Sequence, residues 1–193
     1  MKLLVMILSL IATGCAYKIG HQDRKLPEGY KTVFVSQFTN ATKSVGAEAF
    51  FTTAMIRELK RSGFAFVADR NQAELVITGR IMMMDYSGTS TTAGFQTFPD
   101  PDDNNRVRTF NASLFTRYLL SAVAHVKVLK TVDNSVVWQS TFRGSKNFLA
   151  PSITNAGVRS ANPLYNQSIR DENVRVVANE MMNEAFDQLT ESF

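Results

Sequence analysis

Residues 32–63 show two contrasting hydrophobic patterns, one typical of a strand and one typical of a helix. Residues 32–38 are rich in β-branched and aromatic side chains, which predicts a strand. Over residues 46–62 the apolar side chains recur at helical spacing, and Gly63 follows as a typical helix stop. The apolar positions that define this predicted helix are Phe51, Ala54, Met55, Ile56 and Leu59.

A second pair of extended segments follows the predicted helix. Residues 64–67 form a short extended piece, and residues 75–86 predict a longer strand in which Gly79 permits a close approach by a neighbouring group. A strand, a helix and a strand in this order predict a right-handed crossover connection. The two strands that flank the helix are therefore expected to be parallel.

The second half of the chain shows strict alternation and then a second helical stripe. Residues 114–131 place Leu120, Ala122, Ala124, Val126 and Val128 on one face and Ser121, Val123, His125, Lys127 and Leu129 on the other. Asp133 and Asn134 predict a tight turn into a return strand over residues 136–143, with Trp138 and Phe142 on the face opposite Arg143. Residues 171–190 then predict a long amphipathic helix.

These elements predict an α+β fold, a two-layer α/β sandwich in the order β-α-β-β-β-α. Two helices should cover one face of a four-stranded mixed sheet, and the other face should stay uncovered. Residues 32–193 are expected to be a single domain. The stretches 87–113 and 144–167 are rich in small, polar and turn-forming residues and are predicted to be long loops.

The N-terminus has the layout of a secretory signal. Lys2 is followed by an apolar run, then by Ala12, Thr13 and Gly14, and then by Cys15, which is the one cysteine of the chain. This ending resembles a bacterial lipobox, although Ala12 stands where Leu is usual. Residues 1–14 are therefore expected to be a lipoprotein signal peptide and Cys15 the lipid-modified mature N-terminus, with an N-acyl and an S-diacylglycerol group. A buried N-terminal strand with a core cysteine is the alternative.

The residues after the cysteine bear on where the protein is located. Ala16 replaces the Asp that retains such lipoproteins, so the usual sorting pattern implies the outer membrane, with the domain on the periplasmic side. Residues 15–31 are polar and irregular and are expected to be a tether between the lipid and the domain.

The amino-acid composition excludes several classes of protein and of site. Apolar residues make up 45% of the 193 residues and charged residues 20%, so the chain can bury a core and is not a disordered tail. A net charge of +4 is too small to indicate a nucleic-acid binder. One cysteine excludes an internal disulfide and a cysteine-based zinc site.

Sequence motifs of catalysis and of cofactor binding are missing. The chain has no glycine-rich phosphate loop, no H-E-x-x-H pattern and no G-x-S-x-G elbow. Met82, Met83 and Met84 are consecutive in a predicted strand, so they alternate between its faces and favour core packing over a copper site. We therefore expect neither an enzyme nor a protein with a metal or other cofactor.

Several short motifs in a fixed order resemble the LptE family of outer-membrane lipoproteins that assemble lipopolysaccharide. They cover residues 15–86 well and residues 114–145 and the final helix more loosely. The matching segments are Cys15-Ala16-Tyr17, Leu26-Pro27-Glu28-Gly29, Thr32-Val33-Phe34-Val35, Phe38-Thr39-Asn40-Ala41-Thr42, Arg57-Glu58-Leu59, Ala73-Glu74-Leu75-Val76-Ile77-Thr78-Gly79-Arg80-Ile81, Tyr118 and Val136-Val137-Trp138.

The resemblance implies a domain that plugs the barrel of LptD, assists its folding and contacts lipopolysaccharide. Lipid A phosphates attract Arg and Lys through charge-assisted hydrogen bonds. Cations in or beside the predicted strands are the candidate ligand-binding residues, although ordinary solvated charges are an equal alternative. They are Arg80, Arg117, Lys127, Arg143 and Lys146.

A rival class shares the first half of the pattern. Accessory lipoproteins that activate a cell-wall synthase or form part of a secretion complex also open with a strand ending in Phe-x-Asn-x-Thr. They generally place a longer helical segment before the later strand, whereas here only Asn71, Gln72 and Ala73 separate Arg70 from Glu74. A periplasmic binding module of another kind is the third possibility.

Overall fold

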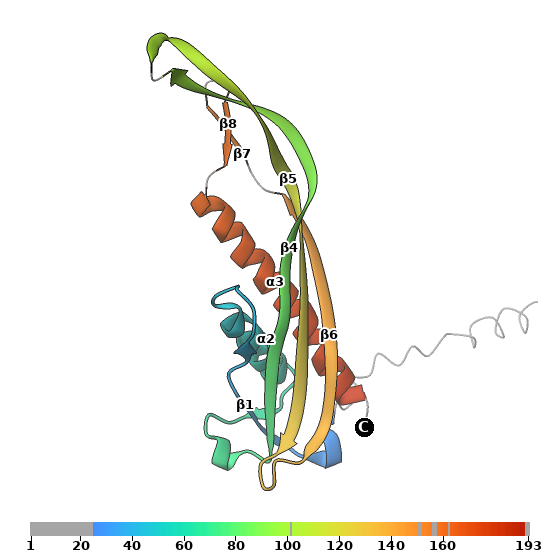
Figure 1. The fold of residues 1–193 in the computed structure, drawn as a ribbon. Coiled ribbons are helices and arrows are strands. Elements are labelled where there is room, and N and C mark those ends of the chain that lie inside the picture. The colour runs from blue at the N-terminus through green and yellow to red at the C-terminus, as the bar shows by residue number, and fades with distance from the viewer. Residues whose placement is uncertain (1–24, 101, 150–151, 156–157, 162, 192–193) are drawn as a thin grey trace, which may run out of the picture.

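The computed structural model describes residues 25–100, 102–149, 152–155, 158–161 and 163–191, and the predicted signal peptide and Cys15 lie outside them. Two helices and one large sheet form an elongated molecule (Figure 1). The helices are α2 (Ala47–Arg61) and α3 (Pro163–Glu191). The sheet contains β1 (Thr32–Val35), β2 (Thr39–Asn40), β3 (Ala65–Phe66), β4 (Leu75–Asp100), β5 (Asp103–Lys130) and β6 (Val136–Leu149).

The sheet order confirms the predicted topology. The strands run β3-β1-β4-β5-β6, with β2 beside β4, and β7 (Ser152–Asn155) pairs with β8 (Val158–Ala161) in a separate hairpin. Strand β1 is parallel to β4, as the crossover predicts, while β4, β5 and β6 are antiparallel neighbours. The turn at Asp133 and Asn134 is also confirmed, because Asn134 has a positive φ and Asp133 accepts hydrogen bonds from Ser135.

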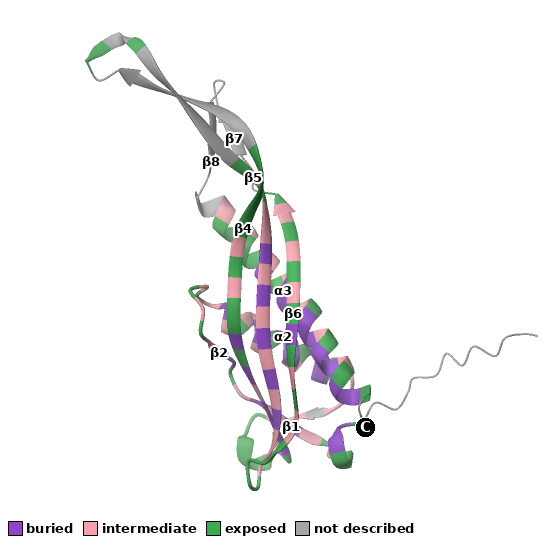
Figure 2. Ribbon diagram, turned by 45° about the vertical axis from the view of Figure 1, so that its right-hand side comes forward, coloured by how far each residue is buried: buried purple, intermediate pink, exposed green. Residues whose placement is uncertain are grey.

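Burial alternates along β5 with a period of two, as Figure 2 shows. The predicted apolar face, Leu120 to Val128 in steps of two, is almost completely buried, and the residues between are only half-buried. Both helices pack on the buried face, where α2 contributes Phe51, Met55 and Leu59 and α3 contributes Val177, Met181 and Phe186. The α+β sandwich with its helices on one face is therefore confirmed.

The predicted loop over residues 87–113 is wrong. Strands β4 and β5 continue through it as an antiparallel ribbon that pairs from Ser87 and Leu119 almost to its tip at Asp100 and Asp103. Residues 144–167 are also not a continuous loop, because β6 extends to Leu149 and β7 and β8 follow. Pairing within a hairpin provides hydrogen bonds for the backbone N–H and C=O groups of these segments. Such strands need no buried apolar face, so their sequence lacks the alternating pattern by which a core strand is recognised.

Two element boundaries also differ from the prediction. Helix α3 starts at Pro163 instead of near Asp171, because proline is favourable in the first helical turn, where its missing N–H costs nothing. At the other end of the chain, residues 25–31 pack on the domain instead of continuing the tether. Leu26 is buried in the core, and Glu28 forms an ion pair with Lys130 at 2.9 Å.

The Phe38 ring packs directly against Gly79 of β4. This contact connects the start of β4 to the segment that precedes α2. A Cβ added at Gly79 would overlap the Phe38 ring atoms Cδ2, Cε2 and Cζ. Phe38 is buried and packs against Phe51 of α2, with ring centroids 6.5 Å apart. The close approach expected at Gly79 is confirmed, and the group that approaches is an aromatic ring.

Glu74, just before β4, connects β4 to the start of β1 through hydrogen bonds. Its carboxylate accepts hydrogen bonds from the backbone N–H groups of Lys31 and Thr32 at 2.8 and 3.0 Å and from the Thr32 hydroxyl at 3.0 Å. The two backbone donors, Lys31 first, hold the pKa of Glu74 below its ordinary value because they favour the charged form.

Gly79→Ala should lower the free energy of unfolding by about 1–3 kcal/mol, the usual cost of overpacking. The cost should shrink in a Phe38→Leu background, since leucine lacks the atoms corresponding to Cε2 and Cζ. Urea titrations followed by the fluorescence of Trp138, the single tryptophan, complete the double-mutant cycle. An equal cost in both backgrounds would show that the Phe38 ring does not constrain Gly79.

Glu74→Gln should destabilise the protein at neutral pH, and the loss should fade in acid. A carboxyl with a depressed folded-state pKa stabilises the fold above its unfolded pKa of about 4.3, and that contribution disappears as pH falls through the folded-state pKa. Thermal unfolding of both proteins from neutral to acidic pH measures the difference. A difference in stability between the two proteins that stays constant from neutral to acidic pH contradicts a stabilising role of the Glu74 carboxylate.

Candidate functional site

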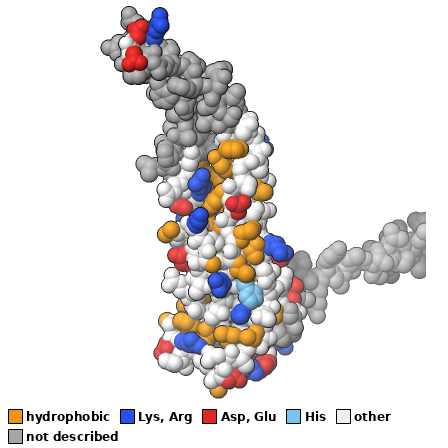
Figure 3. Space-filling view, viewed as in Figure 1, with side chains coloured by type: hydrophobic (Ala, Val, Ile, Leu, Met, Phe, Trp, Pro, Cys, Tyr) orange, Lys and Arg blue, Asp and Glu red, His pale blue; other side chains and the backbone are white. Residues whose placement is uncertain are grey.

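The sheet has one face that neither helix covers, and we call it the open face. It is formed by the side chains of β4, β5 and β6 that alternate with the core residues, and Figure 3 views the molecule from this side, with basic and hydrophobic side chains intermingled. Its principal members are Arg80, Met83, Asp85, Leu119, Val123, His125, Lys127 and Arg143.

Four basic side chains form the centre of the open face, and we call them the basic cluster: Arg80, His125, Lys127 and Arg143. Strand register brings them together, because Arg80 is the direct cross-strand neighbour of His125. Lys127 follows His125 by two residues on the same strand, and Arg143 lies diagonally across from His125 on β6. Arg80 and Lys127 are diagonal neighbours on one face of the sheet, about 7–8 Å apart, so these two cations repel one another.

The described part of the chain supplies no counter-ion to this cluster. Among the described residues, Arg80, Lys127 and Arg143 form neither an ion pair nor a side-chain hydrogen bond. Asp85 lies farther along the same face and accepts a hydrogen bond from Ser87 at 2.9 Å. A group of uncompensated cations on a sheet surface is a suitable site for an anionic ligand.

Exposed apolar side chains adjoin the basic cluster. Met83 is 43% exposed and lies in register with Val123, which in turn is opposite Arg143. Met82, at the irregularity in β4, is 55% exposed. Core packing, expected for the methionine run, therefore applies only to Met84, which packs against the core, and is wrong for Met82 and Met83. The open face combines cations with flexible apolar side chains.

The five candidate cations predicted from the sequence do not form one site. Arg80, Lys127 and Arg143 come together. Arg117 is exposed on the open face but lies eight residues from His125 along β5, about 26 Å away. Lys146 points to the other face, where its Nζ lies 3.3 Å from a carboxylate oxygen of Glu180 on α3. Side-chain alternation along β6 already separates Lys146 from Arg143.

Two features of the site were missed at the level of sequence. The alternation predicted for residues 114–131 places His125 on the face opposite the apolar residues, but its position at the centre of the basic cluster depends on the strand register. The second feature is an aromatic group near the base of the β4–β5 ribbon. The Arg170 guanidinium lies 5.3 Å from the ring centre of Tyr86 and 5.8 Å from that of Tyr118, which stacks on Phe148.

A model of one protein family matches residues 30–192 of the chain, and its description is lipopolysaccharide assembly. The chain belongs to the LptE family. Members of this family are lipoproteins without enzymatic activity that take part in lipopolysaccharide assembly. The family resemblance carried by the short sequence motifs is therefore confirmed.

Comparison with other proteins adds similarity of structure only. No curated protein sequence matches this LptE-family chain. A putative lipoprotein from Caulobacter crescentus is 11% identical, with a TM-score of 0.48 over 82% of this chain and 88% of its own. Lipoprotein B from Nitrosomonas europaea is 9% identical, with a TM-score of 0.47 over 91% of each chain. Similarities at this level carry no argument about function.

The described residues contain neither a candidate metal site nor a candidate membrane-spanning helix. No group of His, Cys, Asp or Glu side chains among them is arranged to hold a metal ion. No helix in the same part of the chain is both long and apolar enough to cross a membrane.

Proposed function

We propose that this LptE-family chain binds lipopolysaccharide on its open face while it plugs, and helps to fold, an LptD-like barrel in the outer membrane. The observation that carries the lipopolysaccharide part is the basic cluster of Arg80, His125, Lys127 and Arg143 without counter-ions among the described residues. The family supports the assembly role and implies the barrel partner.

The chemistry of the open face matches the two parts of a phosphorylated glycolipid. Guanidinium and ammonium groups form strong, charge-assisted hydrogen bonds to phosphate, and binding would also relieve the repulsion within the cluster. Met82 and Met83 offer flexible apolar contacts of the kind that suits acyl chains. Arg117 and Lys146 lie outside the cluster, so we assign the phosphate contacts to Arg80, Lys127 and Arg143.

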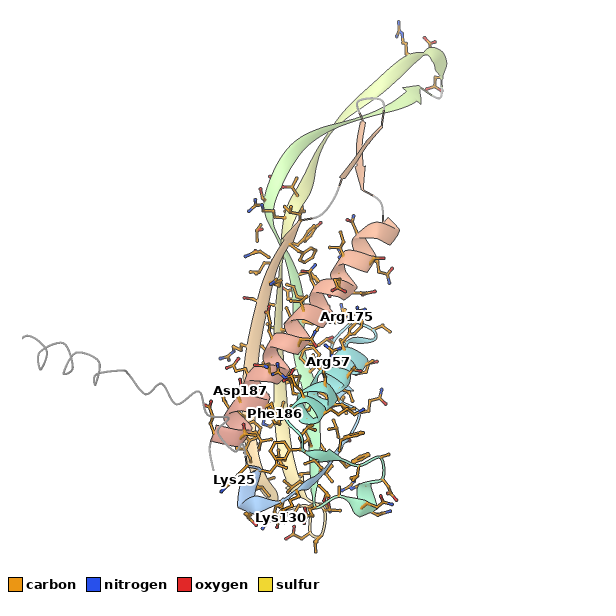
Figure 4. The ribbon with its side chains drawn as sticks, turned by 180° about the vertical axis from the view of Figure 1, so that it is seen from behind. Lys25, Arg57, Lys130, Arg175, Phe186 and Asp187 are labelled. Atoms are coloured by element: carbon orange, nitrogen blue, oxygen red, sulfur yellow. The ribbon has the colours of Figure 1, made fainter. Side chains whose placement is uncertain are left out.

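A lipid on Cys15 would place the domain close to the membrane. Ten residue steps separate Cys15 from Lys25, the first described residue, and they span at most about 36 Å. Lys25 and Lys130 lie at the same end of the domain, and the β4–β5 ribbon projects from the opposite end (Figure 4). The tether therefore holds the end that carries Lys25 within this distance of the periplasmic surface of the outer membrane.

Charge reversal at the cluster should weaken lipopolysaccharide binding without unfolding the domain. Loss of one charge-assisted hydrogen bond costs about 1.5–3 kcal/mol, so Lys127→Glu with Arg143→Glu should weaken binding at least about 100-fold. The control is Lys43→Glu with Lys60→Glu, which makes the same charge change off the open face. Calorimetric titration with lipopolysaccharide gives the affinities, and Trp138 fluorescence checks the fold. Equal losses of affinity in both double variants would contradict the assignment of the lipopolysaccharide site to the open face.

Cys15→Ser should release the protein from the membrane. A thioether-linked diacylglycerol requires the cysteine thiol, and two or more acyl chains are what makes such anchoring stable. Fractionation of cells and partition into detergent separate anchored from free protein. A Cys15→Ser variant that still co-sediments with outer membranes after a high-salt wash contradicts lipid anchoring at this residue.

A further inference from the structure

The β4–β5 ribbon continues beyond the three-stranded part of the sheet. Strand β6 ends at Leu149, opposite Arg117, while β4 and β5 remain paired with each other to Asp100 and Asp103. The ribbon projects past the ends of both helices (Figures 1 and 2). A two-stranded ribbon is marginally stable in water by itself, so this extension is expected to gain a partner.

The two edges of the ribbon differ in their protection against further pairing. The β4 edge carries Gly88, Gly94 and Pro99, it has one extra residue, Thr89, between paired positions, and β8 lies close to β4. Glycine, proline and irregular register are the features that keep an edge strand from pairing with another chain.

Along residues 107–115 the β5 edge lacks these features, because the irregularities of β5, at Thr116 and at residues 104–106, lie beyond the ends of this stretch. Residues 109–116 contain no charge, no proline and no glycine. An uncharged edge of this length is a template for an added strand. Because β6 occupies the same edge of β5 up to Leu149, a strand that continued in line with β6 would extend an existing three-stranded arrangement.

The charges around this edge specify the partner. Arg106, Arg108 and Arg117 flank residues 109–116, and residues 104–117 include no acidic residue. Among the described residues, Arg117 has no ion pair, and Arg106, with its side chain 79% exposed, has only a 3.4 Å contact with Asp103. The arrangement therefore favours a strand with carboxylates near its ends.

The same charges disfavour a second copy of this chain as the partner. If residues 109–116 of two copies paired antiparallel and in register, Arg108 of each copy would come next to Arg117 of the other. Like charges in adjacent cross-strand positions are destabilising.

We propose that residues 109–116 of β5 bind an extended, acidic segment of the outer-membrane barrel protein by strand addition. This inference rests on the proposed function, which supplies the barrel as partner. The ribbon is fixed at its base, because Arg170 of α3 contacts Tyr86 and Tyr118 and Tyr118 stacks on Phe148. The receiving edge therefore has a set direction relative to the domain.

Photocrosslinking in native outer membranes tests the added strand. Ser113 of β5 and Ala93 of β4 are direct cross-strand neighbours and therefore form a matched pair of positions. A p-benzoylphenylalanine at Ser113 should form an adduct with the barrel, because an added strand would lie about 5 Å away. The same residue at Ala93 should give a clearly weaker adduct, since it is one strand farther from the partner.

Single prolines then test whether the contact is made through the backbone. Of the consecutive positions Asn111 and Ala112, one directs its N–H toward β4 and the other toward the free edge. Proline at the outward position should lower the adduct yield from Ser113 by roughly 3- to 10-fold, the effect of one lost hydrogen bond, while Trp138 fluorescence reports an unchanged fold. Proline at the inward position should disturb the ribbon itself.

The outcomes separate the inference from the proposed function. If the wild-type chain, solubilised in detergent, does not co-purify with a barrel protein, the proposed function fails and this inference fails with it. If the barrel co-purifies but Ser113 and Ala93 give equal adducts, or neither gives one, only the inference fails. Adducts of the chain with itself, or with lipopolysaccharide alone, also overturn it.

Discussion

The structure depends on one constraint, the burial of a single face of β5 against two helices. Small residues on that face, Ala122 and Ala124, let α3 approach closely, and at Gly144 of β6 an added Cβ would meet the side chains of Met181 and Val177. Close packing of this kind requires a strict period of two along the strands. The same period places every intervening residue on the face that neither α2 nor α3 covers, so one pattern determines both the core and the open face.

The strand register that the buried core requires also determines which side chains lie on the open face. A shift by one residue would bury the cations and expose the aliphatic residues. Arg80, His125, Lys127 and Arg143 gather only because three strands align there, and no described acidic residue neutralises them. Membership of the LptE family, whose members take part in lipopolysaccharide assembly, is the reason to propose an anionic, acylated ligand for this surface.

Sequence patterns predicted the parts of the fold that are governed by burial. The crossover, the alternation in β5 and the two amphipathic helices were all recognisable, because a buried face leaves a periodic signal. Residues 87–113 were not, since the ribbon is held by hairpin pairing and its Ser- and Thr-rich sequence resembles a loop. Likewise, Arg80, Lys127 and Arg143 could be selected as strand cations, but their convergence on His125 required the register. Leu26 was missed because a single apolar residue beside Pro27 shows no period.

Lysine acylation with and without lipopolysaccharide tests the central claim, that the open face is the ligand-binding surface. Lys127 lies in the basic cluster and Lys146 on the opposite face beside Glu180, and both belong to the part of the chain that the structure describes. Mass spectrometry after brief acetylation measures the reactivity of each. Lipopolysaccharide should protect Lys127 from acetylation and leave Lys146 as reactive as before. Unchanged reactivity at Lys127, or protection of Lys146 in its place, would contradict the claim.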